Sequence, residues 1–316
     1  MKLVLTGSTG FVGSKLLTSL SSYDVTVIGR TKPKSSLNYK FYQAEINHAA
    51  DYLPALSGAD ILIHSAARVH VMDDNVADPL AEFRAINTEG TVNLAKQAAE
   101  AGVKRFIFIS SIKVNGESTS LNNPFRPDGE VAPQDPYGVS KAEAEEGLKN
   151  IAKETGLEVV IIRPPLVYGP NVKANFSTMM KWINKGVPLP LGAIHNQRSF
   201  VALDNLVGFI IRCIDHPKAA NEVFLISDDE DVSTSELLRK VAKAFGKKAL
   251  LLPIPVWLMT SVAKLVGKGD VANRLFGSLQ VDSSKARELL GWKSVITMDE
   301  QLKKTADTYL EHEKTL

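Results

Sequence analysis

A tyrosine and a lysine four positions apart are the residues of this chain best suited to acid–base chemistry. Tyr137 and Lys141 lie in the segment 136–141, directly before a strongly helical run. Their spacing puts both side chains on one face of a helix. A free phenol has a pKa of about 10, so proton transfer near neutral pH needs a stabilised phenolate, which a nearby ammonium provides. The pair therefore predicts proton transfer to or from a substrate oxygen.

A serine earlier in the chain extends this pair. Ser111 follows the apolar run Phe106–Ser110, which we expect to form a strand. From there its hydroxyl can hold a reacting oxygen against the phenol, which is positioning chemistry and not nucleophilic catalysis. A Tyr-x-x-x-Lys pair arises easily by chance, and the order of a glycine loop, this serine and then the pair makes the pattern specific. We predict Ser111, Tyr137 and Lys141 as the catalytic residues.

Three glycines spaced by three follow the first expected strand, Leu3–Thr6, and open a helix that runs through Leu20. Such glycines permit a tight turn, a close approach of the backbone to a pyrophosphate and close packing of helix on sheet. The helix N-terminus then faces the anion. A glycine-rich turn without a ligand is the alternative, which the placement between strand and helix disfavours. The expected cofactor contacts in this loop are Gly7, Thr9, Gly10, Phe11, Val12 and Gly13.

The choice of cofactor should be set at the end of the second strand, Val25–Ile28, where a carboxylate would hold the adenosine ribose of NAD. Arg30 stands there instead, and Asp24 lies at the other end of the strand. An arginine can pair with a 2′-phosphate through its planar guanidinium. We therefore expect NADP(H), with NAD(H) and a solvated Arg30 as the alternative.

Short apolar runs alternate with helical periods throughout the first half of the chain. Parallel strands need crossover connections, which helices supply, so this alternation predicts an α/β fold, a Rossmann-type doubly wound parallel sheet with a smaller C-terminal substrate-binding lobe. Ligands should bind beyond the carboxyl ends of the strands. The expected strands are Leu3–Thr6, Val25–Ile28, Phe41–Gln43, Ile61–His64, Phe106–Ser110 and Val159–Ile162.

The pattern changes after residue 165 to turn-rich segments and separate helices. We expect a NAD(P)-binding domain over 1–165, with returns near 198–226, and a mainly substrate-binding lobe over 166–316. The most apolar stretch, 250–266, is broken by prolines and a lysine and is too short to span a bilayer. A packed helix that starts near Pro255 is expected there, with an interfacial or partner-binding role as the alternative.

Composition narrows the function further. The chain has 316 residues, of which 44% are hydrophobic and 23% charged, with a formal net charge of +2. This is an ordinary globular surface without the basic excess of a nucleic-acid-binding protein. The single cysteine, Cys213, forms no internal disulfide, and the His and Cys spacings do not suit a metal. A small-molecule partner, no metal and a cytoplasmic location are therefore expected.

Taken together, these motifs resemble the extended short-chain dehydrogenase/reductases, the NAD-dependent epimerase/dehydratase family, over essentially the whole chain. Further matching stretches are 65–67, 87–91, 163–170, 198–201, 282–285 and 290–292. The resemblance implies cofactor contacts at Glu45, Ile46, Ala66, Ala67, Asn87 and Pro164, beside Tyr137 and Lys141. It also implies that Asn175 and Arg198 contact the diphosphate of a nucleotide-linked sugar, and that helices over Pro79–Ala101 and Pro136–Glu154 form a homodimer.

Within the family, segments 66–72 and 110–117 look most like bacterial reductases of UDP-4-keto-6-deoxy-N-acetylhexosamine, enzymes of surface-polysaccharide synthesis. Proteins of this group are often labelled UDP-glucose 4-epimerase. Arg30, in place of an acid, and Leu166, in place of a substrate-binding asparagine, both depart from true 4-epimerases. Lys113 and His70 are particular to the subgroup, and for each a substrate contact and a solvated loop residue are equally open.

Three functions remain. The first is NADPH-dependent reduction of a UDP-linked 4-keto sugar at C4, with the sugar nucleotide as partner. The second is a 4-epimerase with retained NAD that oxidises and then re-reduces the same carbon. The third is a catalytically silent nucleotide sensor or scaffold, since fold alone does not fix function. Intact Ser111, Tyr137 and Lys141 argue against the third function.

Overall fold

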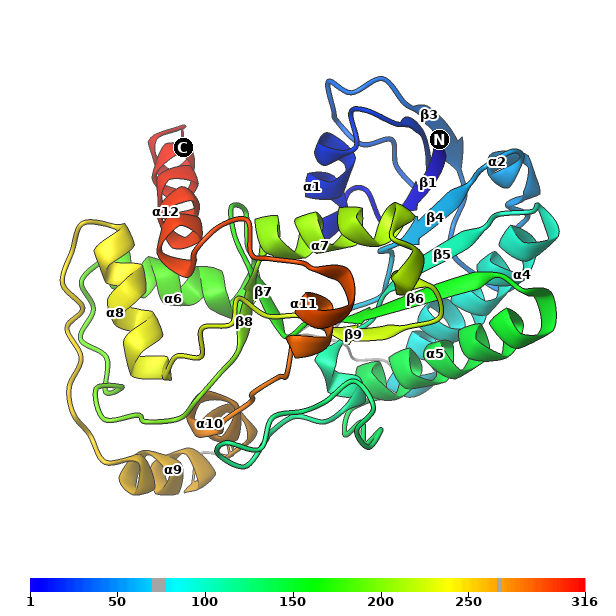
Figure 1. Cartoon of the computed structure of the whole chain (residues 1–316). Helices are drawn as coiled ribbons and strands as arrows, with labels where there is room; N and C mark the ends of the chain where they lie inside the picture. Colours follow the sequence, from blue (N-terminus) through cyan, green and yellow to red (C-terminus); the bar gives the residue numbers. More distant parts are fainter. Residues whose placement is uncertain (70–77, 266, 268, 316) are drawn as a thin grey trace.

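The computed structural model describes residues 1–69, 78–265, 267 and 269–315. Within this part of the chain a parallel sheet of seven strands has the order β3-β2-β1-β4-β5-β6-β9 (Figure 1). The strands are β1 Lys2–Thr6, β2 Asp24–Gly29, β3 Lys40–Gln43, β4 Ile61–His64, β5 Arg105–Ile109, β6 Glu158–Arg163 and β9 Val223–Leu225. The predicted doubly wound sheet is confirmed, and the six expected strands match the observed ones within a residue at either end.

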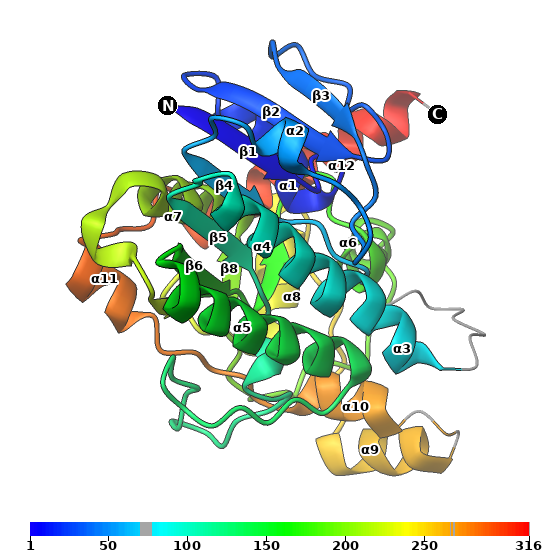
Figure 2. The same cartoon turned by 90° about the vertical axis from the view of Figure 1, so that its right-hand side faces the viewer.

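Alternating side chains along the strands build two apolar layers, one on each face of the sheet. On β1, Leu3 and Leu5 pack into one layer, whereas Val4 packs into the other. Helices α1 (Phe11–Ser19) and α7 (Leu203–Asp215) cover the first face. Helices α4 (Thr91–Glu100) and α5 (Pro136–Thr155) lie side by side across the second face, as Figure 2 shows.

Shorter elements connect these layers. They are α2 (Leu53–Leu56), α3 (Pro79–Phe83), a π-helical stretch (Arg84–Gly90) and a 3₁₀ turn (Ile112–Val114). The π-helical stretch runs directly into α4 and packs on α5. Such wide turns are rare in proteins overall, and many of those that occur lie at functional sites. Here the wide turn carries Asn87, one of the expected cofactor contacts.

The C-terminal part builds a third apolar cluster away from the main sheet. Helices α6 (Ala174–Asn184), α8 (Thr234–Ala244) and α12 (Met298–Thr315) surround it, and the short parallel strands β7 (Leu166–Tyr168) and β8 (Phe200–Ala202) lead into it. The remaining elements are a 3₁₀ turn at Pro217–Ala219 and helices α9 (Val256–Leu265), α10 (Gly269–Phe276) and α11 (Ser284–Leu290). The domain boundary near residue 165 stays a prediction.

Helix α9 corrects one expectation. It begins at Val256, next to Pro255 as predicted, but it is not a packed core helix. None of the residues Val256–Leu265 is buried, because the helix lies at the periphery and contacts mainly α10. In the described part of the chain, no helix is long and apolar enough to cross a membrane.

Candidate active site

The first turn of α5 is fixed by its own sequence. Asp135 caps the helix, with its Oδ1 accepting the backbone N–H of Gly138 at 2.7 Å, and Pro136 occupies the first helical position. A Cβ on Gly138 would lie 2.9 Å from the carbonyl oxygen of Lys113, so only a glycine lets the helix start sit against that loop. These constraints hold Tyr137 beside the segment that follows β5.

Ser111 and Tyr137 meet there, as the sequence predicts. Burial and then the Asp135 carboxylate raise the pKa of Tyr137 to about 12, although a hydrogen bond with the Ser111 hydroxyl opposes this rise. The phenol also makes an edge contact with Phe83, with ring centroids 6.0 Å apart. At neutral pH Tyr137 is therefore protonated and can donate a proton.

Lys141 lies one helical turn further on, and its side chain is only 1% exposed. Its Nζ donates to the carbonyl oxygen of Ile109 at 2.8 Å and stands 4.2 Å from the centre of the Phe108 ring. Burial lowers the pKa of Lys141 to about 7, although the nearby Glu145 carboxylate opposes this. The Lys141 side chain thus binds the end of β5, next to Ser111, and a pKa of about 7 lets the surrounding groups decide whether it is charged.

Lys113 is held by acidic groups. Its ammonium pairs with the Asp135 carboxylate and, at 3.1 Å, with Oε1 of Glu117. This pairing links the loop after β5 to the cap of α5 and leaves the side chain partly exposed beside Tyr137's helix. His70, the other residue particular to the subgroup, lies outside the described residues.

A buried ionic network between α5 and the sheet holds the elements that carry the site. Arg163, at the end of β6, donates from Nε to Oε1 of Glu145 at 2.9 Å and from Nη2 to Oε2 at 2.5 Å. Ser110 donates to the same carboxylate at 2.6 Å, and Asn115 accepts from Nη1 of Arg163 at 2.9 Å. This network ties α5, β5, β6 and the loop after Ser111 into one unit.

The glycine loop has the form that a dinucleotide needs. Gly7 has a φ of +73°, and a Cβ there would lie 2.5 Å from the backbone nitrogen of Ala66. A Cβ on Gly13 would lie 2.1 Å from the carbonyl oxygen of Gly7, so the loop packs backbone against backbone. Gly10 precedes α1 without a side-chain cap, which leaves the helix N-terminus free for an anion. The loop therefore fits a pyrophosphate, and Thr9, Phe11 and Val12 are partly or fully exposed along it.

The two ends of β2 carry opposite charges. Arg30 follows the carboxyl end of the strand and is exposed, whereas Asp24 begins the strand and lies 3.7 Å from Nζ of Lys40. Asp24 is thus too far along the strand to meet a ribose at the ligand edge. Glu45 and Ile46 follow β3 at the same edge as Arg30.

The other expected cofactor residues gather around the carboxyl ends of β4 and β6. Ala66 and Ala67 follow β4, and Asn87 holds the next residue, accepting the backbone N–H of Arg68 at 2.8 Å and donating to its carbonyl at 3.0 Å. Asn87 also donates to the Ser140 hydroxyl on α5 at 3.0 Å. Pro164 is buried, and its carbonyl accepts from Ile112 N–H at 3.0 Å. Asn87 is therefore a buried brace between the β4 loop and α5.

The expected diphosphate contacts come from the C-terminal part. Arg198 is partly buried, which lowers its pKa, and its Nη1 donates to the carbonyl oxygen of Gly277 at 3.0 Å. Asn175 is exposed at the start of α6, where Lys173 and Ser177 line a hollow of about 530 Å³ between α6 and α12. Leu166 is 43% exposed at the start of β7.

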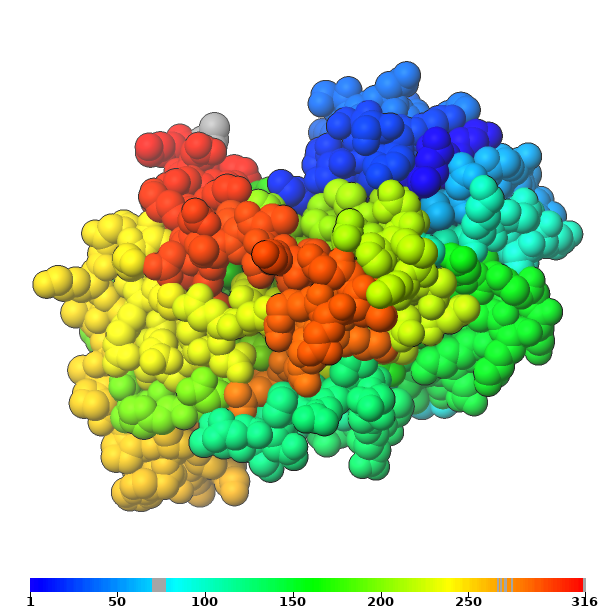
Figure 3. All heavy atoms as spheres, in the orientation of Figure 1, coloured from blue at the N-terminus to red at the C-terminus, as the bar shows by residue number. Residues whose placement is uncertain are grey.

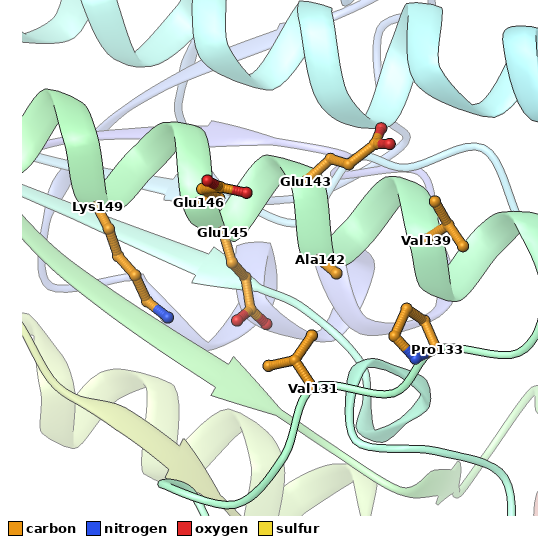
Figure 4. Close-up of a pocket in the computed structure, with 8 residues that line it drawn as sticks. All are labelled: Val131, Pro133, Val139, Ala142, Glu143, Glu145, Glu146 and Lys149. Carbon is orange, nitrogen blue, oxygen red and sulfur yellow. The ribbon is translucent and has the colours of Figure 1, made fainter.

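A second hollow, of about 380 Å³, lies between α5 and the loop that carries Val131 and Pro133 (Figure 4). Its lining residues are Val131, Pro133, Val139, Ala142, Glu143, Glu145, Glu146 and Lys149. The three predicted catalytic residues are not among them. We therefore assign the chemistry to the carboxyl edge of the sheet and not to this hollow.

Sequence reasoning missed several residues that shape the site. Glu145 continues the spacing of Tyr137 and Lys141 by four more residues, and Arg163 ends an otherwise apolar buried strand. A charged side chain in a buried strand requires an oppositely charged partner, so the sequence already indicated both Arg163 and Glu145. His64 gave no signal, yet it is fully buried at the end of β4 and hydrogen-bonds Thr6 at 2.7 Å and Thr91 at 2.9 Å.

Comparison with known proteins identifies the family. The model of the NAD dependent epimerase/dehydratase family matches residues 3–227. The chain belongs to this family. It is an enzyme of the short-chain dehydrogenase/reductase type, as the sequence predicts.

Relatives agree with this assignment, and solved structures share the fold. The chain is 51% identical to the UDP-glucose 4-epimerase of Vibrio cholerae over 98% of its own length and 95% of that protein. It is 27% identical to the N-acetyl-alpha-D-glucosaminyl-diphospho-ditrans,octacis-undecaprenol 4-epimerase of Escherichia coli O157:H7, covering 98% and 96% of the two chains. The UDP-glucose 4-epimerase of Thermotoga maritima with UDP-glucose has a TM-score of 0.78 at 24% identity, covering 99% of this chain and 100% of that one. The Bordetella bronchiseptica enzyme WbmG with NAD has a TM-score of 0.78 at 22% identity, covering 99% and 94%.

Proposed function

We propose that this enzyme reduces C4 of a UDP-linked 4-keto-6-deoxy-N-acetylhexosamine with NADPH, in the synthesis of a surface polysaccharide. The observation that carries the proposal is Arg30 at the carboxyl end of β2, where a NAD-retaining enzyme would place a carboxylate. An arginine at this edge suits the 2′-phosphate of NADPH. A reductase must exchange its cofactor in every cycle, whereas an epimerase must keep it.

The protonation state of Tyr137 suits the reduction step. Reduction of a ketone needs a proton donor, and a phenol whose pKa is raised to about 12 is protonated at neutral pH. When bound, NADPH supplies the hydride. Ser111 holds the carbonyl oxygen and Tyr137 donates the proton to it, while Lys141 would hold the cofactor ribose and stabilise the charge that develops on the phenolate.

Binding groups outside the reaction centre then set the position of the sugar. We assign the diphosphate to Asn175 and Arg198, and the pyrophosphate of the cofactor to residues 7–13. Lys113 lies between Asp135, the cap of α5, and Glu117, and we assign it to the sugar. We further propose a cytoplasmic homodimer with residues 1–165 as cofactor domain and 166–316 as mainly substrate lobe.

A 4-epimerase is the second candidate. It is favoured by the 51% identity with a relative from Vibrio cholerae that carries the name UDP-glucose 4-epimerase. The same three residues serve both reactions, because an epimerase oxidises C4 and then reduces it again. The two candidates differ in whether external reductant is consumed and in how firmly the dinucleotide is held.

The deciding experiment follows NADPH absorbance with purified enzyme and freshly prepared UDP-4-keto-6-deoxy-N-acetylglucosamine. Stoichiometric loss of NADPH, at a higher kcat/KM than with NADH, is the expected result, and Tyr137→Phe is expected to lower kcat by about 10²–10⁴. Interconversion of UDP-N-acetylglucosamine and its C4 epimer without added reductant would instead establish the epimerase. If cells with Tyr137→Phe have the same phenotype as wild-type cells, the catalytically silent scaffold is supported.

The cofactor assignment has its own control within the chain. Arg30→Ala is expected to raise KM for NADPH at least about tenfold and to leave KM for NADH unchanged, because it removes one charge-assisted contact to the 2′-phosphate. Lys40→Ala removes an exposed cation at the opposite end of the neighbouring strand and is expected to change neither constant. Equal changes with both cofactors would exclude a 2′-phosphate contact.

A further inference from the structure

Helix α9 presents an apolar face to solvent. Trp257 is 70% exposed and Leu265 86%, and Leu258 and Val262 are also exposed. At 100° per residue these four side chains fall in one arc of the helix. The partly covered residues Val256, Met259, Thr260 and Ala263 fall in the opposite arc, so the large apolar side chains point outward as a set. Single exposed apolar residues need no explanation, but a whole helical face of them does.

The position of α9 suits binding to a lipid surface better than binding in a protein groove. The helix and its neighbour α10 project from one end of the molecule in Figures 1 and 2, and α9 forms the lower left end of the surface in Figure 3. A single convex helix inserts easily into the boundary between lipid headgroups and acyl chains, where it buries its outer arc. Because α9 has only ten residues, it can lie in a membrane surface but cannot cross it.

The charge around α9 selects the kind of lipid. From the end of α8 through α9, residues 245–265 contain three lysines and no acidic residue, and Lys247, Lys248 and Lys264 are all exposed. Lys264 is exposed beside Trp257 in the helical projection, and a tryptophan and a lysine together are typical of the headgroup region. The segment would therefore be attracted to an anionic surface, and a neutral one would attract it less.

The helix is also linked to the proposed diphosphate site. The chain leaves α10 at Phe276 and reaches Gly277, whose carbonyl oxygen accepts from Arg198 at 3.0 Å and from Nδ2 of Asn196 at 2.8 Å. A surface bound to α9 would thus lie against the lobe that carries Arg198.

From these observations we infer that the outer face of α9, formed by Trp257, Leu258, Val262 and Leu265 with Lys264 at its rim, docks the enzyme on an anionic phospholipid surface. The arrangement is peripheral and reversible, because one short helix buries little area. The inference does not depend on which reaction the enzyme catalyses.

The test measures sedimentation of the full-length protein with vesicles of phosphatidylcholine alone and of phosphatidylcholine mixed with phosphatidylglycerol. The wild type is expected to sediment with the mixed vesicles and to be released by salt. The Trp257→Glu, Leu265→Glu double variant is expected to bind at least about tenfold more weakly, since burial of even one such side chain is worth more than a factor of ten. Lys264→Glu is expected to weaken binding to the mixed vesicles alone.

A matched control separates α9 from general surface apolarity. Val295 is 64% exposed in the segment before α12, and Val295→Glu is expected to bind vesicles like the wild type. Thermal unfolding verifies that each variant is folded, which is expected because α9 contributes no buried side chain. The inference is overturned if wild type binds neither vesicle, or if the control loses as much binding as the double variant. A lower mass of the double variant in light scattering would assign this face to a second copy of the chain instead.

Discussion

The Nζ of Lys141 is buried between an aromatic ring and a backbone carbonyl, so the groups around it decide whether it is charged. Glu145 on the same helix favours the ammonium, whereas burial favours the neutral amine and lowers the lysine pKa to about 7. His64 on β4 is close enough for the lysine to help lower the histidine pKa. Glu145 is in turn shared with Arg163, which makes this carboxylate the centre of the residues beneath the site.

Glu145→Gln tests that centre. The change leaves Arg163, which is 1% exposed, without its charged partner, and breaking such a pair costs about 3–5 kcal/mol in the free energy of unfolding. Urea unfolding with an unchanged m value measures the loss. Glu146→Gln, at the exposed neighbouring position, is expected to stay within about 0.5 kcal/mol of wild type. Equal stability of the two variants would mean that the buried pair contributes nothing.

Residue types and spacing predicted that the serine after β5 meets the tyrosine at the start of α5, but not how the other side chains point. Ser111 and Tyr137 meet as expected because a strand end and a helix start bring them together. The contacts of Lys113 with Asp135 could not be predicted, since they depend on where a loop of non-regular backbone runs. Asn87 was expected at the cofactor, and its amide is used to brace two backbone segments.

At the scale of elements, the site depends on how closely the glycine loop and the loop after β4 approach. Gly7 and Gly102 both have positive φ, +73° and +78°, but a Cβ on Gly102 would meet nothing within 4 Å. An alanine at either position carries the cost of a left-handed conformation, about 1–2 kcal/mol. Only the alanine at position 7 must also displace the backbone of Ser65 and Ala66.

The two alanine variants therefore separate strain from close approach. Gly7→Ala is expected to lower NADPH affinity at least about tenfold, because residues 7–13, to which we assign the pyrophosphate, can then no longer pack closely against Ser65 and Ala66. Gly102→Ala is expected to lose the same 1–2 kcal/mol, roughly, in the free energy of unfolding and to bind NADPH with unchanged affinity. Fluorescence titration with NADPH, together with urea unfolding of each variant, measures both quantities. Normal NADPH affinity in Gly7→Ala would show that the close approach is unnecessary for binding.

His64 joins three elements, with Thr6 at the end of β1 on one side and Thr91 at the start of α4 on the other. Burial and then Lys141 lower the pKa of His64 from 6.5 to about 3. The unfolded chain therefore binds a proton more readily between these two pH values. Stability from the neutral histidine is present above pH 6.5 and is lost as pH falls towards 3.

His64→Gln is expected to remove this contribution. Between the two pH values, the free energy of unfolding of the wild type should fall more steeply than that of the variant, by up to about 1.4 kcal/mol per pH unit. Above neutral pH the difference between them should be constant. Denaturant unfolding over a series of pH values measures both slopes, and parallel curves below pH 6.5 would contradict the assignment.

Most of the elements could be predicted because apolar alternation and turn residues are local signals. The strands of the sheet follow from apolar runs that are buried on both faces. The π-helical stretch Arg84–Gly90 has no such signal, since its width depends on packing against α5. The exposure of α9 was missed for a related reason, because an apolar helix looks the same in sequence whether or not something covers it.

At the scale of the whole molecule, the outer face of α4 and α5 is the surface where the family resemblance places a second copy. Val139 and Ala142 line the hollow on α5. Glu143 nearby pairs with Arg84, whose Nε donates to Oε2 of Glu143 at 2.9 Å. A partly apolar helical surface of this kind can be covered by its symmetry mate in a two-fold dimer. The dimer is a prediction that rests on the resemblance and on this surface.

Light scattering after size exclusion tests the dimer directly. Wild type is expected to have twice the mass of the 34.4 kDa chain, and Ala142→Arg is expected to have the mass of one chain, because it places a charge in the centre of the shared surface. Ala220→Arg, at a partly exposed alanine before β9, should remain dimeric. All the predicted cofactor contacts come from one chain, so we expect monomeric Ala142→Arg still to bind the proposed cofactor NADPH. If the Ala142→Arg and Ala220→Arg variants have the same mass as wild type, α4 and α5 do not form the contact between copies, and the two copies meet elsewhere or not at all.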